Sequence, residues 1–224
     1  MDYESAEHHP AFEEYSETVY ELAEDGVPVI QARIAERLEV SRPAVSEMIR
    51  RMEKEGLVDV DDDSRISLTK SGNALASTIV RRHRLAEVFL TEVLGLSWAD
   101  AHQEAGRWEH VISPLVEGAM MRILDDPTTC PHGNPIPGSG YTAPGRPVAL
   151  ADVEPGSTFV VERIPEELEF ADGQLEFLEN AGLKPGCEGT LLSVAPDRTT
   201  TVSVEGIPVG VGAFTAERIV VSAG

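Results

Sequence analysis

Residues 41–56 read Ser-Arg-Pro-Ala-Val-Ser-Glu-Met-Ile-Arg-Arg-Met-Glu-Lys-Glu-Gly, and this stretch carries the signals of a complete helix. Ser41 is the predicted N-cap, because its hydroxyl can accept a hydrogen bond from a free backbone N–H of the first turn. Pro43 follows in that turn, where its missing N–H removes no hydrogen bond. The helix is predicted to run to Glu55 and to end at Gly56.

The segments on both sides of this helix complete a small folding unit. Two further helices are predicted before it, over residues 11–25 and 29–38, because apolar side chains recur there at three- and four-residue steps. After it, residues 57–60 and 65–69 flank an acidic turn and alternate in polarity, which is typical of a β-hairpin. A helix, a short helix, a tight turn, a third helix and a hairpin together predict a winged helix-turn-helix.

Such a unit places one helix in the major groove of DNA, with its N-terminal residues nearest the bases. The groove-facing candidates are Ser41, Arg42, Pro43, Ala44 and Glu47. The candidates for phosphate contact are Arg33, Arg37, Arg50, Arg51 and Lys54. Three-helix stretches also occur in proteins that do not bind DNA, but the hairpin and the local charge favour DNA binding.

The charge is distributed unevenly along the chain. The whole chain has 18 Lys and Arg against 39 Asp and Glu, and its net charge of −21 taken alone argues against nucleic acid as a partner. Residues 31–84, however, hold eleven basic and nine acidic residues, a net charge of +2. Because DNA phosphate responds to local charge, the predicted helix-turn-helix lies in the part of the chain best able to approach DNA.

The composition excludes several classes of protein. With 224 residues, 42% hydrophobic and 25% charged, the chain has the composition of a folded globular protein. No apolar run reaches 18 residues, so we expect no membrane span. The acidic start, Met1-Asp-Tyr-Glu4, does not fit a secretory signal, and two distant cysteines, Cys130 and Cys187, form no disulfide framework. We therefore expect a cytoplasmic protein with unpaired thiols.

Beyond the hairpin, the sequence predicts a helical part and then a β-rich part. Residues 72–96 form a long helix and residues 98–124 one or two more, with more apolar surface than a small monomeric unit can bury, so we expect a dimer interface there. Residues 125–147 are rich in Pro and Gly and are predicted to be a semi-stiff linker. The predicted strands then lie at Thr158–Arg163, Glu188–Ala195, Thr200–Val204 and Arg218–Val221, with a short helix at 172–181.

Candidate metal ligands recur at helical spacing in three of the predicted helices. His83 and Glu87 are four residues apart and share one helix face. A second face carries His102, Gly106, Glu109 and His110, and a third carries Glu14 and Glu17. Taken singly, each pair could equally be a set of solvated residues on the outer face of a helix. Together, imidazoles and carboxylates that converge from several helices suit Mn, Fe, Zn or Co.

These stretches resemble the diphtheria toxin repressor family of metal-dependent transcriptional repressors. The likeness is carried by Ala32–Leu38, Arg82–Glu87, Arg107-Trp-Glu-His110 and Gly133-Asn-Pro-Ile-Pro-Gly138. The C-terminal part, with Phe177–Gly186, is similar to the family's SH3-like (FeoA-like) domain. The resemblance implies an α+β protein with a winged helix-turn-helix DNA-binding domain (1–74), a helical dimerisation and metal-binding domain (75–126), a Pro/Gly-rich linker (127–146) and an SH3-like domain (147–224).

The resemblance also implies two metal sites. The family's ancillary site is matched by His83, Glu87 and His102. Two side chains of the SH3-like domain can join this site in the family, and Gln174 matches one of them. Ala171 stands at the position of the other, an acid, so the neighbouring Asp172 is the candidate there. The primary site is matched by Glu109 and His110, whereas the Met and Cys ligands of the iron branch are replaced by Glu14 and Gly106.

This loss of both sulfur ligands favours Mn(II), because carboxylates suit hard cations. The manganese branch has acids where Glu14 and Glu17 lie, although it often has another Glu where this chain has Gly106; water or the Gly106 carbonyl would fill that position. Fe(II) is the alternative, and Zn(II), Co(II) or Cd(II) are possible in vitro. Where iron-type members have Gln on the reading helix, this chain has Glu47, which could accept a hydrogen bond from cytosine N4.

We therefore expect a homodimeric, metal-activated repressor that binds double-stranded operator DNA and has neither a membrane nor a small organic substrate as partner. A small metallohydrolase is the rival from a different class, but no HExxH helix, phosphate loop or nucleophile elbow is present. Two further hypotheses are a winged-helix regulator that senses an organic ligand, and an interaction module whose SH3-like domain binds a Pro-rich segment such as residues 131–147.

Overall fold

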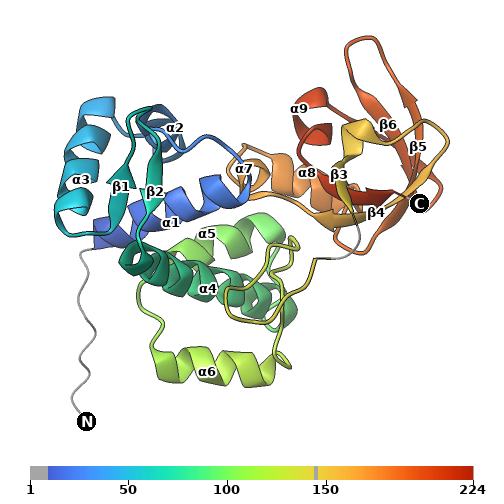
Figure 1. Cartoon of the computed structure of the whole chain (residues 1–224). Coiled ribbons are helices and arrows are strands. Elements are labelled where there is room, and N and C mark those ends of the chain that lie inside the picture. Colours follow the sequence, from blue (N-terminus) through green and yellow to red (C-terminus); the bar gives the residue numbers. More distant parts are fainter. Residues whose placement is uncertain (1–9, 144–145, 224) are drawn as a thin grey trace.

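The computed structural model describes residues 10–143 and 146–223. The acidic N-terminus, which we expect not to be a secretory signal, lies outside the described residues. In Figure 1 a helix-turn-helix unit and a β-rich domain lie at opposite sides, and three helices, α4, α5 and α6, lie below and between them. The C-terminal end of helix α1 meets the β-rich domain at α7.

The first unit consists of α1 (Pro10–Glu24), α2 (Gln31–Arg37), α3 (Arg42–Lys54), β1 (Val58–Val60) and β2 (Ile66–Leu68). The Ser41 hydroxyl accepts a hydrogen bond from the Ala44 N–H at 3.3 Å and so caps α3 as predicted. The strands β1 and β2 are antiparallel, with Val58 opposite Leu68. Ile34, Val45 and related side chains form a buried core under this hairpin. The predicted winged helix-turn-helix is confirmed.

The second unit is helical: α4 (Lys70–Glu92), α5 (Trp98–Trp108) and α6 (Pro114–Ile123). The Thr69 hydroxyl caps α4 by accepting from the Gly72 N–H at 3.1 Å. Within this unit, Leu85, Leu90 and Ala105 are fully buried. Large apolar side chains remain exposed at the end of α4, between α5 and α6, and on α6: Val93, Leu94, Val111, Leu115, Val116 and Ile123.

The Pro- and Gly-rich segment after α6 packs against α4 and is not a free spacer. Its side chains Cys130, His132, Asn134 and Ile136 are buried. Its backbone is tied to itself, for example by the Ile136 N–H, which donates to the Thr128 carbonyl at 2.9 Å. Proline and glycine exclude regular structure here, as predicted, but they do not prevent burial.

The third unit is the β-rich domain. Its sheet is antiparallel throughout, with strand order β3 (Pro147–Ala149), β8 (Val220–Ala223), β4 (Thr158–Arg163), β5 (Glu188–Val194), β6 (Thr200–Val204) and β7 (Ile207–Val211). A 3-10 turn at Leu150–Asp152 and helices α7 (Glu166–Glu169), α8 (Gln174–Asn180) and α9 (Ala213–Ala216) complete it around one apolar core. The predicted α+β architecture with an SH3-like domain is confirmed.

Strands β3 and β7 and helices α7 and α9 were not predicted from the sequence. Strand β7 contains Pro208 and Gly210, which resemble turn residues; proline is tolerated because β7 is an edge strand. Helices α7 and α9 are four residues each, too short for a periodic signal. Among the described helices, none is both long and apolar enough to cross a membrane.

Candidate metal centre

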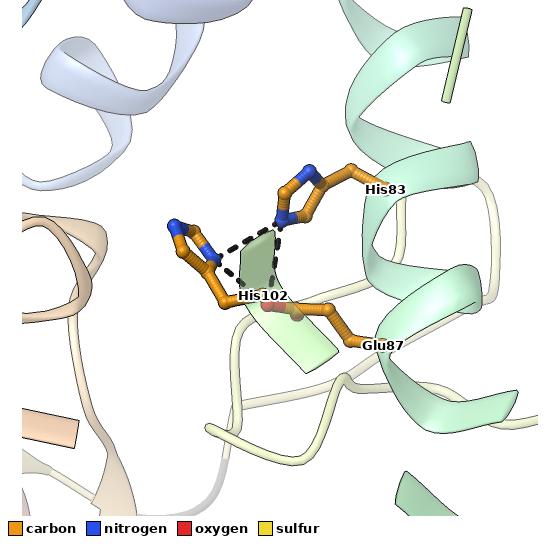
Figure 2. Close-up of side chains that lie close together, drawn as sticks. All are labelled: His83, Glu87 and His102. Carbon is orange, nitrogen blue, oxygen red and sulfur yellow. Dashed lines mark hydrogen bonds and ion pairs between the residues drawn. The ribbon is translucent and has the colours of Figure 1, made fainter. Parts of the chain in front are cut away.

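The centre begins on α4, where His83 and Glu87 project from the same face one turn apart. His83 Nε2 lies 3.3 Å from Glu87 Oε1. His102 from α5 joins them, with its Nδ1 3.0 Å from Glu87 Oε1 and 3.3 Å from His83 Nε2. Figure 2 shows the two rings and the carboxylate turned toward one another, and their ligand atoms all lie within 4.8 Å. The structure thus brings together the three residues matched to the ancillary site.

The second nitrogen of His83 faces another cluster. His83 Nδ1 lies 2.6 Å from Glu109 Oε2, and Glu17 from α1 completes a second group whose ligand atoms lie within 4.8 Å of one another. All three side chains are buried. One imidazole therefore separates two potential metal positions, one of which includes a residue of the DNA-binding unit.

The neighbouring His110 also contacts α1, through Glu13. His110 Nδ1 lies 2.8 Å from Glu13 Oε2, and its Nε2 lies 3.2 Å from Glu109 Oε1. Glu13 and Glu14 are four and three residues before Glu17, so both lie near its face of α1. Glu14 is exposed and lines a cavity beside the cluster together with Glu17 and His110, whereas Glu13 contacts His110 directly. The sequence pattern had pointed to Glu14 and gave no reason to choose Glu13.

A third group joins the predicted Glu87 to two residues that were not predicted from the sequence. Glu87, Cys130 and His132 have ligand atoms within 4.8 Å of one another, and all three are buried. His132 Nδ1 lies 3.8 Å from Cys130 Sγ and 3.5 Å from Glu87 Oε1. Cys130 and His132 lie in the stretch that the sequence predicts to be a linker, and side chains of a linker are not expected to be buried ligands.

The SH3-like domain contributes Glu169, from α7. Its Oε2 lies 3.2 Å from His102 Nδ1 and 2.9 Å from His132 Nδ1, and the Asn134 amide donates to its Oε1 at 2.6 Å. Asp172 is exposed. The Gln174 amide oxygen instead accepts a hydrogen bond from the Thr215 hydroxyl at 2.7 Å. Glu169, rather than either predicted residue, is the carboxylate of the SH3-like domain that pairs with the imidazoles, and Glu166 of the same helix forms a further group with His102 and Glu169 whose ligand atoms lie within 4.8 Å of one another.

Close packing of charges shifts the pKa values of these groups. Burial lowers the pKa of His83, but the carboxylates of Glu87 and Glu109 outweigh it and hold this pKa well above its usual range. Burial and the Glu109 carboxylate raise the pKa of Glu17 well above its usual range. Burial also raises the pKa of the Cys130 thiol to about 12. Positive charge therefore stabilises this buried cluster, because the carboxylates favour the protonated form of His83 and Glu17 stays protonated more readily than a free glutamate.

The residues present fit divalent metal ions. Among the described residues, buried Glu17 Oε1, Glu87 Oε2 and His132 Nε2 have no hydrogen-bond partner, and such orphaned ligand atoms are costly unless something binds them. A cavity of about 460 Å³ adjoins the cluster and is also lined by Gly106, where an added Cβ would meet no atom within 4 Å.

The predicted DNA-contacting residues are exposed, with one exception. Those exposed are Arg33, Ser41, Arg42, Pro43, Ala44, Glu47, Arg50, Arg51 and Lys54. Arg37 is not available to phosphate. Its side chain is only 6% exposed, its Nη2 pairs with Glu21 at 3.5 Å, its Nη1 donates to the Glu166 carbonyl at 3.1 Å, and it stacks on Phe170. Basic residue type alone could not reveal that this arginine faces inward.

Family profiles match all three units of the chain. The N-terminal DNA-binding domain of iron-dependent repressors matches residues 9–65, and the metal-binding and dimerisation domain of the same proteins matches residues 69–138. The FeoA domain matches residues 148–223. These matches together cover most of the sequence, and the first of them ends just before β2 of the DNA-binding unit.

Individual relatives lead to the same family as the profiles. The iron-dependent repressor IdeR of Mycobacterium tuberculosis is 40% identical over 204 residues, 87% of this chain and 88% of its own length. The diphtheria toxin repressor of Corynebacterium diphtheriae is 41% identical over 184 residues, 79% of this chain and 81% of its own.

Solved structures similar to this chain also belong to metal-dependent regulators. A manganese-dependent transcriptional repressor in complex with manganese superposes with a TM-score of 0.83 at 30% identity, covering 95% of this chain and 100% of its own. The manganese regulator SloR superposes with a TM-score of 0.76 at 33% identity, covering 95% and 98%. With a DNA-binding unit, a helical unit that gathers potential metal ligands and an FeoA-like domain, the chain belongs to the diphtheria toxin repressor family of metal-dependent transcriptional repressors and is not an enzyme.

Proposed function

We propose that this chain is a Mn(II)-activated repressor that binds operator DNA as a homodimer. The observation that supports Mn(II) is the cluster around His83 and His110, where carboxylates of Glu13, Glu17 and Glu109 approach the imidazoles and no sulfur atom of the described chain takes part. Oxygen-rich sites with few imidazoles suit Mn(II) better than softer metals.

Metal and DNA binding are coupled, in this proposal, through α1. Glu13 and Glu17 belong to the DNA-binding unit, whereas His83, Glu109 and His110 belong to the helical unit. A bound cation would supply positive charge between the buried carboxylates of Glu17 and Glu109. These residues would then hold α1 against α4 and α5, and the exposed N-terminal part of α3 would be fixed in its place relative to the partner subunit's reading helix.

Fe(II) is the second candidate, because one observation favours it. The group of Glu87, Cys130 and His132 includes a sulfur ligand, and sulfur favours softer metals. IdeR, which is similar over most of this chain, is also named as an iron-dependent repressor.

A mobility-shift titration tests the proposal. A duplex selected from random sequences in Mn(II) is titrated with protein in EDTA, in Mn(II) and, without oxygen, in Fe(II). We expect Mn(II) to tighten binding by about 5- to 150-fold. Equal binding in EDTA and in Mn(II) would contradict a metal-activated repressor, and a larger effect of Fe(II) at matched free concentration would contradict the manganese assignment.

Two matched variants test the ligand assignment. Glu17→Gln removes a buried carboxylate beside His83 and Glu109, whereas Glu14→Gln changes an exposed one in the same helix. We expect the first variant to need at least about tenfold more Mn(II) for half-maximal DNA binding. The second variant, which changes an exposed carboxylate of the cavity, should have a smaller effect; the reverse order would make Glu14 the stronger ligand.

A further inference from the structure

The apolar core of the SH3-like domain includes a large side chain from the helical unit. Trp98, the first residue of α5, is 5% exposed and belongs to the same buried cluster as Phe159 and Leu178. Among the residues that the structure describes, the other buried members of this cluster lie between Leu150 and Val221. The helical unit therefore inserts an indole ring into the neighbouring domain.

Polar and aromatic contacts hold the same tryptophan. Its backbone N–H, a free donor of the first turn of α5, donates to Glu179 Oε2 on α8 at 3.1 Å. Lys184 Nζ lies 5.4 Å from the centre of the indole ring, within the range of a cation–π interaction. The indole also meets the His132 ring edge to face, with 4.7 Å between the ring centres. Trp98 thus contacts both the SH3-like domain and an imidazole of the metal centre.

A second junction joins the SH3-like domain to the Pro- and Gly-rich segment that folds back onto α4. The Ile164 N–H donates to the His132 carbonyl at 2.8 Å, and the Asn134 amide donates to the Ile164 carbonyl at 2.9 Å. Between them, a Cβ on Gly133 would lie 2.3 Å from the Glu162 carbonyl oxygen, and its φ of +85° also favours glycine. The two backbones therefore approach as closely as glycine allows.

These contacts use neither the carboxylate oxygens nor the ring nitrogens of the metal groups. Domains of one chain are expected to move relative to each other unless a substantial apolar interface joins them, and the buried indole supplies such an interface. We propose that Trp98 and Gly133 keep the SH3-like domain docked on the helical unit without metal, with Trp98 as a positioning residue that holds Glu169 beside His102 and His132. The inference goes beyond the proposed function and does not depend on which metal activates the chain.

The alternative is a domain that metal must draw in, and one amide distinguishes the two cases. The Ile164 N–H is bonded across the junction, whereas the Leu191 N–H donates to the Ser157 carbonyl at 3.0 Å inside the SH3-like domain. Hydrogen exchange reports the opening of each bond separately. If metal draws the domain in, Ile164 is protected from exchange only with metal, while Leu191 is protected in both states.

The experiment measures exchange at these two amides by fragmentation mass spectrometry, in EDTA and in saturating Mn(II). It uses the unchanged full chain and the variants Trp98→Ala, Trp98→Phe and Gly133→Ala. Phe159→Leu is the matched control, because Phe159 is buried in the same core but belongs to β4 and not to α5. This control shows what weakening the domain itself does to the two amides.

We expect the Ile164 amide of the unchanged protein to exchange in EDTA at least about a hundredfold more slowly than an unstructured amide. Trp98→Ala and Gly133→Ala should each reduce this protection at least about tenfold and leave Leu191 protected. Trp98→Phe, which keeps an aromatic ring, should restore most of it. Phe159→Leu should change both amides together.

Two results would overturn the inference. The first is an Ile164 amide without protection in EDTA in the unchanged protein. The second is full protection of Ile164 in EDTA in Trp98→Ala or in Gly133→Ala. If Trp98→Ala also removes the protection of Leu191, the domain itself has unfolded, and Gly133→Ala, which leaves the apolar core intact, decides.

Discussion

Gly106 offers room for a ligand that this chain lacks. It lies on α5, lines the cavity beside the metal centre, and an added Cβ there would meet no atom within 4 Å. Its backbone is helical, so any side chain is tolerated without strain. We therefore expect a side chain added at this position to affect metal binding more than folding.

Two substitutions at Gly106 should shift metal preference in opposite directions. Gly106→Glu should raise Mn(II) affinity by about tenfold, because it adds a carboxylate, and Gly106→Cys should raise the affinity for Zn(II) or Co(II) relative to Mn(II). Gly106→Ala is the control, since it adds no ligand. Competition titrations with a metal indicator measure the affinities, and unchanged preference in both variants would exclude position 106 from the site.

Glu21 gives the fold a dependence on pH. Its burial, with the Glu166 carboxylate nearby, raises its pKa from 4.5 to about 8 despite the pairing with Arg37. Because the folded-state pKa is raised, the folded chain holds this proton more tightly than the unfolded chain. The resulting stabilisation is complete below the unfolded pKa and is lost as the pH rises through the folded pKa.

Glu21→Gln should therefore flatten the decrease in unfolding free energy between about pH 5 and 8. Denaturant titrations in EDTA across this range measure it, since EDTA removes the separate effect of metal. Glu53→Gln, at an exposed position of α3, should leave the pH profile of the unchanged protein intact. A profile for Glu21→Gln parallel to that of the unchanged protein would show that Glu21 is not the responsible group.

At the scale of elements, the start of α4 fits closely against Leu57, the residue before β1. A Cβ on Gly72 would lie 1.9 Å from the Leu57 carbonyl oxygen, a backbone atom that cannot turn aside. The Thr69 N–H also donates to this carbonyl at 3.0 Å. The close approach sets the position of the DNA-binding unit on α4.

Gly72→Ala should consequently destabilise the protein by ~1–3 kcal/mol, because the helix must move to admit the methyl group. Gly118→Ala is the matched control: it lies within α6, where a Cβ meets only the end of the Arg122 side chain at 3.7 Å. The control should be neutral or stabilising by up to ~1 kcal/mol. Urea unfolding of both variants measures the difference, and equal stabilities would contradict the tight fit.

The sequence predicted those helices that carry local signals, such as an N-cap residue or a regular apolar spacing. The N-cap at Ser41, the proline after it and the three- and four-residue apolar spacing of α1 to α4 were sufficient to place these helices within a few residues. The pair His83 and Glu87 could be predicted for the same reason, since i and i+4 share a face of any helix. The contact between Glu13 and His110 was not predicted, because it depends on how α1 is rotated about its axis against the end of α5.

The remaining site residues depend on tertiary packing. Glu169 is on a four-residue helix that has no signal of its own, and Cys130 and His132 are on a segment without regular structure. Arg37 and Arg84 are arginines on helices, a residue type that usually lies in solvent, but both are buried by partners far away in sequence. Only the arrangement of the three units in space could identify them.

For the whole molecule, the exposed apolar side chains on the helical unit predict the subunit interface. Leu115 is 81% exposed on α6, and Val111 is 77% exposed just before this helix. Apolar patches of this kind, rimmed by polar residues, mark sites of protein association. They agree with the dimerisation domain that the family profile assigns to residues 69–138.

Leu115→Glu should weaken the dimer by at least about tenfold, because it buries a carboxylate in an apolar interface. Leu192→Glu is the control, since Leu192 is also exposed, at 48%, but lies on β5 of the third domain. Sedimentation equilibrium across a range of concentrations measures both. A monomer–dimer equilibrium unchanged in Leu115→Glu would place the interface elsewhere.

The folded-back segment after α6 also decides where the chain can be shortened. A truncation after Asp126 would remove Cys130 and His132 and take the Pro135 carbonyl from the buried Arg84. A truncation after Ser139 would retain them, together with the hydrogen bond from the Ser139 hydroxyl to the Thr128 carbonyl that closes the loop. A two-domain fragment intended for crystallography or spectroscopy should therefore keep residues through Ser139, although it would still lack the carboxylates of α7.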